Sequence, residues 1–274
     1  MKTLYVSDLD GTLLTPEGRV SPKTAEILNE LIQRGLLISV DTARSIMGIS
    51  IINLRDIHFP LPLILMNGAL LYDMTAGRIE DARLMSAQTV GEVIRLCREH
   101  GKEPLVYHVE GNHISVSYTN PTCPLEWEFI RERSRGFGSF FRQAADYDLS
   151  APAIYFSTQD TYDKLRPIGD ALERMPQVKY VLYQDNYHEN NWYLEVFSCE
   201  GGKDLGMRRL KDYAKADKTV AFGDNFNDLP MLAAADLALV MGNGQEKVKA
   251  AADLVIGPNT ADGVAEYLRR NAEL

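Results

Sequence analysis

Residues 4–13, LYVSDLDGTL, resemble a buried strand that ends at two carboxylates, and this stretch indicates most about the fold of the chain. The run is largely apolar until it meets Asp8 and Asp10, and a buried parallel strand is expected to be apolar along its length. Carboxylates at such a place are costly unless something pairs with them. Side chains alternate along a strand, so Asp8 and Asp10 are expected to point the same way. Two acids at the end of a strand suit a divalent cation and a phosphoryl group, although an isolated Asp-x-Asp is more often a solvated junction between a strand and a turn.

The composition is that of an ordinary globular protein of one large or two modest domains. The 274 residues are 45% hydrophobic and 24% charged, with a net charge of −9. This acidic balance argues against nucleic acid and anionic membranes as partners, because both require a basic surface. An anionic substrate on such a protein needs local positive charge or a metal ion.

Targeting and cysteine patterns predict a reduced, cytoplasmic protein. The first residues hold one lysine and a short apolar stretch that Asp8 interrupts, which is not the pattern of a secretory signal. The most apolar stretch, residues 59–72, is too short to span a bilayer. Cys97, Cys123 and Cys199 are odd in number and widely spaced, as expected for structural thiols rather than disulfides.

Both ends of the chain alternate between strand-like and helix-like patterns. Ser21 and Pro22 mark the start of a helix between the first two strands. Strands are expected at residues 4–7, 36–40, 63–66, 219–222, 237–240 and 254–256, and later helices at 205–214, 229–234, 248–252 and 264–270. Strands separated by helices imply right-handed crossovers, so the predicted fold class is α/β with a doubly wound parallel sheet.

The middle of the chain follows a different pattern. Residues 86–100 have helical spacing, and the strand-like runs 105–109 and 114–118 flank a hairpin turn. Further strands are expected at 153–157, 178–184 and 192–197, with helices near 125–135 and 160–174. We therefore predict an α/β core of residues 1–83 and 199–274, interrupted by an inserted α+β cap domain of residues 84–198.

A second acidic cluster, Gly223-Asp224-Asn225-Phe226-Asn227-Asp228, directly follows the strand at 219–222. In open parallel sheets ligands bind at the carboxyl ends of the strands. Two acidic clusters there can share a cation such as Mg²⁺, which prefers oxygen ligands. The alternative is an Asx-rich turn that caps the next helix. With Asp8 and Asp10 in the same chain, the metal interpretation is favoured.

Three further polar residues lie where a phosphate could bind. Thr42 follows the second strand, where its hydroxyl can hydrogen-bond a phosphate oxygen or simply cap the next helix. Lys203 follows two glycines and can neutralise both a carboxylate and a phosphate, although an isolated lysine is more often a surface residue. Asn67 ends the third strand, and its amide can contact phosphate or shape a turn.

Taken together, these residues resemble the haloacid dehalogenase superfamily, and within it the Cof-type phosphatases of subclass IIB. Their order matches the family: Asp8-x-Asp10-Gly11-Thr12, then Thr42, then Lys203, then Gly223-Asp224-x-x-Asn227-Asp228. The resemblance covers the α/β core at both ends of the chain. The inserted part matches mainly in its position and in its content of strands and helices.

The second motif departs from the family pattern at two positions. Where the family usually has Ala-Thr-Gly-Arg, this chain has Asp41-Thr42-Ala43-Arg44. Asp41 adds an acid near the site, and Ala43 can shift the backbone near a phosphate. We expect these departures to alter the fit of the substrate rather than to abolish the chemistry.

The resemblance implies a role for each site residue. Asp8 is the nucleophile that forms an aspartyl-phosphate, and Asp10 is the acid and base that serves first the leaving group and then water. Lys203 and Mg²⁺ offset the repulsion between an anionic nucleophile and an anionic phosphate. The implied metal ligands are Asp8, Asp10 through its backbone carbonyl, and Asp224; Asp228 supports the metal's water shell or Lys203. The implied phosphate ligands are Thr42, Asn67 and Asn227.

The predicted function is Mg²⁺-dependent hydrolysis of phosphate monoesters of small metabolites, with sugar phosphates first among the substrates. The inserted domain matches the family's cap, which excludes water and selects the leaving group. The expected partner is a small phosphorylated metabolite, with no obligate protein partner. Two alternatives stay open: a phosphomutase on the same core, and a non-catalytic protein that binds phosphorylated metabolites. A dinucleotide-binding enzyme is disfavoured because no Gly-x-Gly-x-x-Gly follows the first strand.

Overall fold

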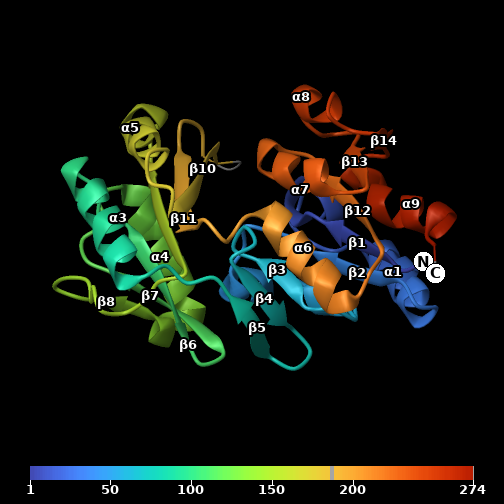
Figure 1. Ribbon diagram of the computed structural model, residues 1–274, viewed down its shortest axis with the longest axis horizontal. Helices are drawn as coiled ribbons and strands as arrows, with labels where there is room; N and C mark the ends of the chain where they lie inside the picture. The colour runs from blue at the N-terminus through green and yellow to red at the C-terminus, as the bar shows by residue number, and fades with distance from the viewer. Residues whose placement is uncertain (186–187, 274) are drawn as a thin grey trace. The chain divides into compact units, whose positions relative to one another are not determined.

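A computed structural model describes residues 1–185 and 188–273 of the chain (Figure 1). The chain forms two compact units. The core unit consists of Met1–Asp81 and Gly202–Leu274, and the inserted unit consists of Ala82–Gly201. Two segments that are far apart in the sequence therefore build one core, and the segment between them builds the other unit.

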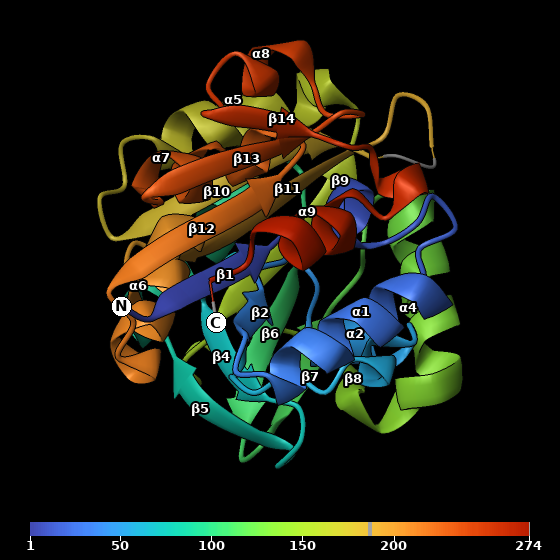
Figure 2. The same cartoon turned by 90° about the vertical axis from the view of Figure 1, so that its right-hand side faces the viewer.

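The centre of the core unit is a five-stranded parallel sheet with the strand order β14-β13-β12-β1-β2 (Figure 2). Its strands are β1 Thr3–Ser7, β2 Leu37–Val40, β12 Lys218–Gly223, β13 Leu237–Met241 and β14 Leu254–Ile256. The predicted α/β class with a parallel sheet is confirmed. Because β1 lies between β12 and β2, the residues that follow β1 lie at the middle of the sheet's carboxyl edge.

Helices cover both faces of this sheet. Helices α1 and α9 pack against each other on one face, and α6 and α7 pack against each other on the other face (Figure 2). Helix α1 begins as predicted, with Pro22 in its first turn and Ser21 Oγ accepting the Thr24 amide at 3.0 Å. The helices of the core unit are α1 Pro22–Gln33, α2 Ile46–Ser50, α6 Lys203–Ala214, α7 Leu229–Ala234, α8 Glu246–Lys249 and α9 Gly263–Asn271. Helix α8 was expected at 248–252; it begins two residues earlier and ends three residues earlier.

Alternation along β1 explains which helices it contacts. Leu4 and Val6 are fully buried in a cluster with Met207 of α6 and residues of α7. Tyr5, which points to the other face, stacks on Phe222, whose ring meets Tyr267 of α9. Continuing the alternation, Asp8 comes next on the face that α6 covers.

A separate three-stranded sheet, in the order β3-β4-β5, follows β2. Its strands are β3 Leu63–Leu65, β4 Leu70–Asp73 and β5 Arg78–Ala82. Strand β3 was expected within the parallel sheet; it pairs antiparallel with β4, and it meets the end of β2 through a parallel bridge between Asp41 and Ile64. This bridge brings the residues after β3 next to the residues after β2.

The inserted unit is built on a six-stranded sheet with the order β10-β11-β9-β6-β7-β8, in which only the β7–β8 pair is parallel. Side chains from α3 and α5 form its hydrophobic core with one face of the sheet. Its elements are α3 Ala87–Glu99, β6 Leu105–Glu110, β7 His113–Tyr118, α4 Pro124–Phe137, β8 Phe141–Gln143, β9 Tyr155–Asp160, α5 Tyr162–Leu172, β10 Val178–Gln184 and β11 Trp192–Ser198.

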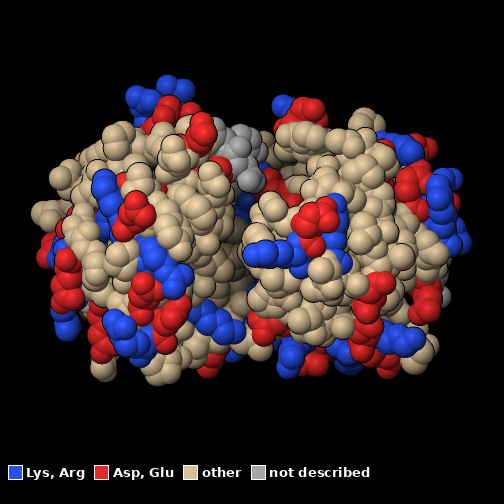
Figure 3. All heavy atoms as spheres, turned by 90° about the horizontal axis from the view of Figure 1, so that it is seen from above, with Lys and Arg blue, Asp and Glu red and all other residues tan. Residues whose placement is uncertain are grey.

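Surface composition agrees with the mixed charge of the sequence. Acidic and basic side chains lie next to one another over the face seen in Figure 3. Within residues 1–185 and 188–273, no helix is long and apolar enough to cross a bilayer.

Candidate active site

A buried lysine joins the ends of three elements at the carboxyl edge of the core sheet. Lys203 Nζ donates to Asp8 Oδ1 at 2.6 Å, to Asp228 Oδ1 at 2.7 Å and to the backbone carbonyl of Asp41 at 2.8 Å. Asp8 follows β1, Asp41 follows β2 and Asp228 precedes α7, while Lys203 begins α6. All three ammonium hydrogens therefore have an acceptor, and the Lys203 side chain is only 1% exposed.

The charges in this cluster shift each other's pKa. Burial lowers the pKa of Lys203, but the carboxylates of Asp228 and Asp8 outweigh it, so the pKa lies above its usual value. Burial, and after it the charge of Asp228, raise the pKa of Asp8 well above its usual range, and Lys203 opposes that rise only in part. The site thus holds more negative charge than its one lysine balances.

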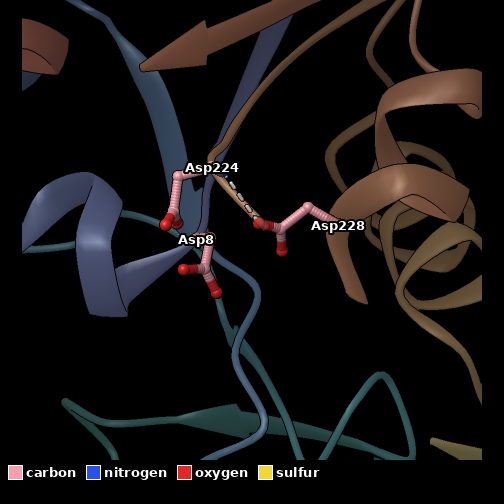
Figure 4. Close-up of side chains that lie close together, drawn as sticks. All are labelled: Asp8, Asp224 and Asp228. Atoms are coloured by element: carbon pink, nitrogen blue, oxygen red, sulfur yellow. Dashed lines mark hydrogen bonds between the residues drawn. The ribbon is translucent and has the colours of Figure 1, made fainter. Parts of the chain in front are cut away.

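Three carboxylates converge at this point (Figure 4). Asp8, Asp224 and Asp228 each offer an oxygen that lies within 4.8 Å of the other two. Asp228 Oδ2 accepts the backbone amides of Asp224 and Asn225 at 2.9 and 3.0 Å, so both its oxygens are engaged. Among the described residues, Asp8 Oδ2 and Asp224 Oδ2 accept no hydrogen bond.

A divalent cation fits this arrangement. Burial, and after it the charge of Asp228, raise the pKa of Asp224 to about 6, as expected for carboxylates that lack a compensating positive charge. Hard cations such as Mg²⁺ bind through one or two carboxylates and keep water in their other positions. Asp8 and Asp224 are the residues that would hold the cation, since Asp228 is already occupied by Lys203 and two amides.

The turn after β1 requires glycine. Gly11 has a φ of +86°, and a Cβ at this position would overlap the Asp224 carboxylate. The next residue, Thr12, is buried, and its Oγ1 donates to Asp224 Oδ1 at 2.8 Å. The Gly-Thr pair therefore packs the turn against the second acidic cluster and orients Asp224.

Strand alternation does not set the direction of Asp10, so the reason for expecting it to point the same way as Asp8 is wrong. Strand β1 ends at Ser7, and Asp10 lies inside the tight turn Leu9–Leu13, where strand alternation does not apply. Its carboxylate faces Arg44, which donates from Nε to Oδ2 and from Nη2 to Oδ1, both at 2.7 Å. Asp8 and Asp10 thus have different cationic partners.

The predicted phosphate ligands lie on neighbouring loops of the core unit. Thr42 and Asn67 are buried, and the backbone amide of Asn67 donates to the backbone carbonyl of Thr42 at 3.1 Å. The Asn67 carbonyl in turn accepts the Gly202 amide at 2.9 Å, one residue before Lys203. Asn227 is half-buried in the turn Phe226–Asp228. Backbone hydrogen bonds therefore tie Thr42 and Asn67 to the start of α6, whereas Asn227 enters from the β12 side.

The model of the haloacid dehalogenase-like hydrolases matches residues 5–268 of this chain. The chain belongs to this family. The pyridoxal phosphate phosphatase YbhA of Escherichia coli is 30% identical to it over 279 residues, covering 95% of both proteins. The 5-amino-6-(5-phospho-D-ribitylamino)uracil phosphatase YitU of Bacillus subtilis is 23% identical, covering 97% of this chain and 96% of that protein.

Solved structures agree on the fold. A haloacid dehalogenase-like hydrolase from Bacteroides thetaiotaomicron superimposes with a TM-score of 0.77 at 23% identity, covering 98% of this chain and 99% of that one. The subclass IIB sugar phosphatase BT4131 superimposes with a TM-score of 0.74 at 24% identity, covering 98% of each chain. The predicted family and enzyme class, a haloacid dehalogenase phosphatase, are confirmed.

Two contacts of this hydrolase were not predicted from the sequence. The Arg44–Asp10 ion pair joins residues 34 positions apart, and the Thr12–Asp224 hydrogen bond joins residues 212 positions apart. Each of these residues belongs to one of the sequence motifs described above. The motifs were thus the available signal, but they do not state which members bind one another.

Asp41, one of the two departures from the family pattern, is a buried acid of this hydrolase. It is fully buried, and among the described side chains neither of its carboxylate oxygens has a hydrogen-bond partner. Burial raises its pKa well above the usual range, and the nearby Lys203 opposes this only in part. A buried carboxyl without a hydrogen-bond partner is costly to ionise, so burial favours the neutral form of Asp41.

The variant Asp41→Asn is therefore expected to keep phosphatase activity within about threefold of the parent, because an amide has the shape of the neutral carboxyl that burial favours. An acid whose pKa is raised on folding stabilises the folded state below its unfolded pKa, and this stabilisation is lost as the pH rises through the folded pKa. The difference in Tm, variant minus parent, is thus expected to increase as the pH is raised above about 4, the unfolded pKa of an aspartate. Asp41→Ala, which leaves a void, is the control. A difference that decreases over this range would show that Asp41 is ionised and paired.

Proposed function

We propose that this hydrolase is a Mg²⁺-dependent phosphatase of small phosphorylated metabolites that works through an aspartyl-phosphate on Asp8. The observation that carries the proposal is the buried Lys203, which is hydrogen-bonded to both Asp8 and Asp228. A lysine in this place holds a carboxylate at the middle of the sheet's carboxyl edge and keeps positive charge beside it. The names of the relatives, a pyridoxal phosphate phosphatase and a ribitylaminouracil phosphate phosphatase, support the substrate class.

The proposed first step transfers the phosphoryl group to Asp8. The carboxylate oxygen of Asp8 forms a bond to phosphorus while the bond from phosphorus to the ester oxygen breaks. The departing oxygen takes a proton from Asp10, and Lys203 stabilises the negative charge around Asp8. Thr42, Asn67 and Asn227 hold the phosphoryl oxygens in line with Asp8.

The second step releases inorganic phosphate. Asp10, now ionised, removes a proton from a water molecule whose oxygen attacks the phosphorus of the aspartyl-phosphate, and the Asp8 carboxylate is regenerated. Asp8 and Asp224, with the backbone carbonyl of Asp10, are the proposed Mg²⁺ ligands. When bound, Mg²⁺ supplies positive charge that offsets the phosphate and the surrounding carboxylates.

Residues of the inserted unit are proposed to select the leaving group, as a cap domain does. A panel of phosphate esters tests the proposed activity: pyridoxal 5′-phosphate, hexose phosphates, nucleoside monophosphates and p-nitrophenyl phosphate, each with Mg²⁺ and with EDTA. Mg²⁺-dependent release of inorganic phosphate is expected with at least one metabolite. Isomerised ester without free phosphate would identify a phosphomutase, and binding without turnover would identify a non-catalytic protein.

The affinity for Mg²⁺ is expected to fall below about pH 6. Burial and the charge of Asp228 raise the pKa of Asp224 to about 6, so at lower pH the metal must displace a proton. One displaced proton lowers the apparent affinity roughly tenfold for each pH unit. Calorimetric titration of the EDTA-treated protein with MgCl₂ at about pH 5 and about pH 7.5 measures the effect.

Asp224→Asn provides the control for this titration, because its amide carries no proton that the metal could displace. We expect this variant to bind Mg²⁺ weakly and to lose the part of the pH dependence that Asp224 contributes, while the part from Asp8 stays. An unchanged Mg²⁺ affinity in Asp224→Asn would contradict the proposed ligand set.

A further inference from the structure

The contact between Arg44 and Asp10 is more specific than a surface ion pair. Two nitrogens of one guanidinium group donate to the two oxygens of one carboxylate, both at 2.7 Å. The side chains are only 20% and 36% exposed. Such bidentate pairing fixes the plane and direction of a carboxylate as well as its position.

Arg44 is itself held at several points. Its Nη1 donates to the Gly48 carbonyl at 3.2 Å, which anchors the third side of the guanidinium group. Its backbone amide donates to Thr42 Oγ1 at 3.2 Å, and its backbone carbonyl accepts the Met66 amide at 3.1 Å. The residue is therefore tied to the loops that carry the proposed phosphate ligands.

The Asp10 carboxylate depends on this one partner. Over the described part of the chain, the only hydrogen bonds that this carboxylate accepts are the two from Arg44. Its backbone lies in a turn with φ −77° and ψ 114°, followed by Gly11 at positive φ. Neither strand nor helix packing fixes the direction of the side chain, so Arg44 does.

We propose that Arg44 is a positioning residue that aims Asp10 at the leaving-group oxygen and then at water. This inference rests on the proposed function, in which the bond from phosphorus to the ester oxygen breaks and that oxygen receives the Asp10 proton. Proton transfer requires the two oxygens to lie within hydrogen-bonding distance of each other. Lysine has the same charge but no planar pair of donors, so it cannot set this direction.

The test compares two leaving groups. The alcohol of pyridoxal 5′-phosphate needs a proton when it leaves, whereas p-nitrophenolate leaves without one. The ratio kcat/KM reports the steps up to the departure of the leaving group. We expect Arg44→Lys and Arg44→Gln to lower kcat/KM for pyridoxal 5′-phosphate by at least about 30-fold, and for p-nitrophenyl phosphate by less than about fivefold, since general acid catalysis contributes roughly 10²–10⁴-fold.

Asp10→Asn is the matched variant, and we expect it to show the same preference for the nitrophenyl ester. If Arg44 acts through Asp10, adding Arg44→Gln to Asp10→Asn lowers kcat/KM for pyridoxal 5′-phosphate by no more than about twofold further. Hexose 6-phosphate replaces pyridoxal 5′-phosphate if the parent hydrolyses only the former.

Three results would overturn the inference. Equal losses with both esters would show a structural role, and a raised KM for both with unchanged kcat would show that Arg44 binds the phosphate directly. A further large loss in the double variant would show that Arg44 acts independently of Asp10. If the parent itself released no phosphate from any ester, the proposed function would fail, which is a different outcome from failure of the Arg44 inference.

Discussion

Replacing Asp8 by asparagine is expected to lower phosphate release by about 10⁴-fold or more while the protein keeps its fold. The amide has the shape of the carboxylate but cannot attack phosphorus. Burial raises the pKa of Asp8 well above its usual range, so removing the charge does not destabilise the folded state. Lys203 keeps Asp228 and the Asp41 carbonyl as acceptors. The Tm is expected to stay within about 4 °C of the parent.

The covalent intermediate gives this prediction a second, independent measurement. Acid quenching of the reaction with ³²P-labelled p-nitrophenyl phosphate traps any aspartyl-phosphate on the protein. Asp10→Asn, the same change two positions along the chain, is expected to accumulate label because the base that activates water is missing. Asp8→Asn is expected to carry none. Label on Asp8→Asn, or full turnover by it, would exclude Asp8 as the nucleophile.

Replacing Lys203 by methionine is expected to abolish turnover and to lower the free energy of unfolding by about 3–5 kcal/mol. The substitution leaves the carboxylates of Asp8 and Asp228 buried without their shared cation. The Lys203 and Asp228 side chains are 1% and 0% exposed, so solvent does not screen the loss. Because its pKa is raised on folding, Lys203 contributes its stability throughout the neutral range, and the destabilisation is expected at every pH below about 10.

Urea denaturation followed by circular dichroism measures this loss. Both tryptophans, Trp127 and Trp192, lie in the inserted unit, so tryptophan fluorescence serves as an internal reference that follows that unit. Lys211→Met is the matched control on the same helix; its lysine lies 3.5 Å from Asp236, in a pair with exposed fractions of 32% and 51%. We expect that variant to lose less than about 1 kcal/mol.

A double variant distinguishes two causes of the lost stability, the unpaired buried charge and the changed packing. Adding Asp228→Asn to Lys203→Met removes one of the two unpaired carboxylates and is expected to restore part of the stability but none of the activity. If the double variant were less stable than Lys203→Met, the buried charges would not be the source of the loss.

Strands of the core were predictable because a buried parallel strand is apolar along its whole length. Carboxylates follow directly after the apolar strands β1 and β12. This change from apolar to acidic residues predicted that the site lies at the edge of the sheet. Strand β5, Arg78–Ala82, has the sequence RIEDA and is partly exposed, so it lacks both the apolar run and the alternation that a prediction needs. Strand β8 consists of only three residues, two of them exposed.

Which residues form the candidate site was more predictable than which of their side chains contact one another. Asp8, Lys203 and Asp224 could be predicted as candidate site residues because carboxylates and a lysine beside buried strands need partners. The direction of Asp10 was not predictable, since it depends on a turn and on an arginine that the fold brings from another loop. Local sequence patterns describe the face on which a side chain lies, but they hold no information on which distant residue meets it.

Because two distant segments of the chain build the core unit, its sheet cannot be completed until late in synthesis. Strand β1 pairs with β12 in a register that joins Thr3 to Lys218, so one edge of β1 stays unpaired until more than two thirds of the chain has been made. Lys203, the partner of the buried Asp8, is also made late. The inserted unit, Ala82–Gly201, is by contrast a single continuous segment. On the ribosome this unit is therefore complete before the core unit is. Until β12 has been made, the first 81 residues expose the unpaired edge of the apolar strand β1, and such an edge favours aggregation.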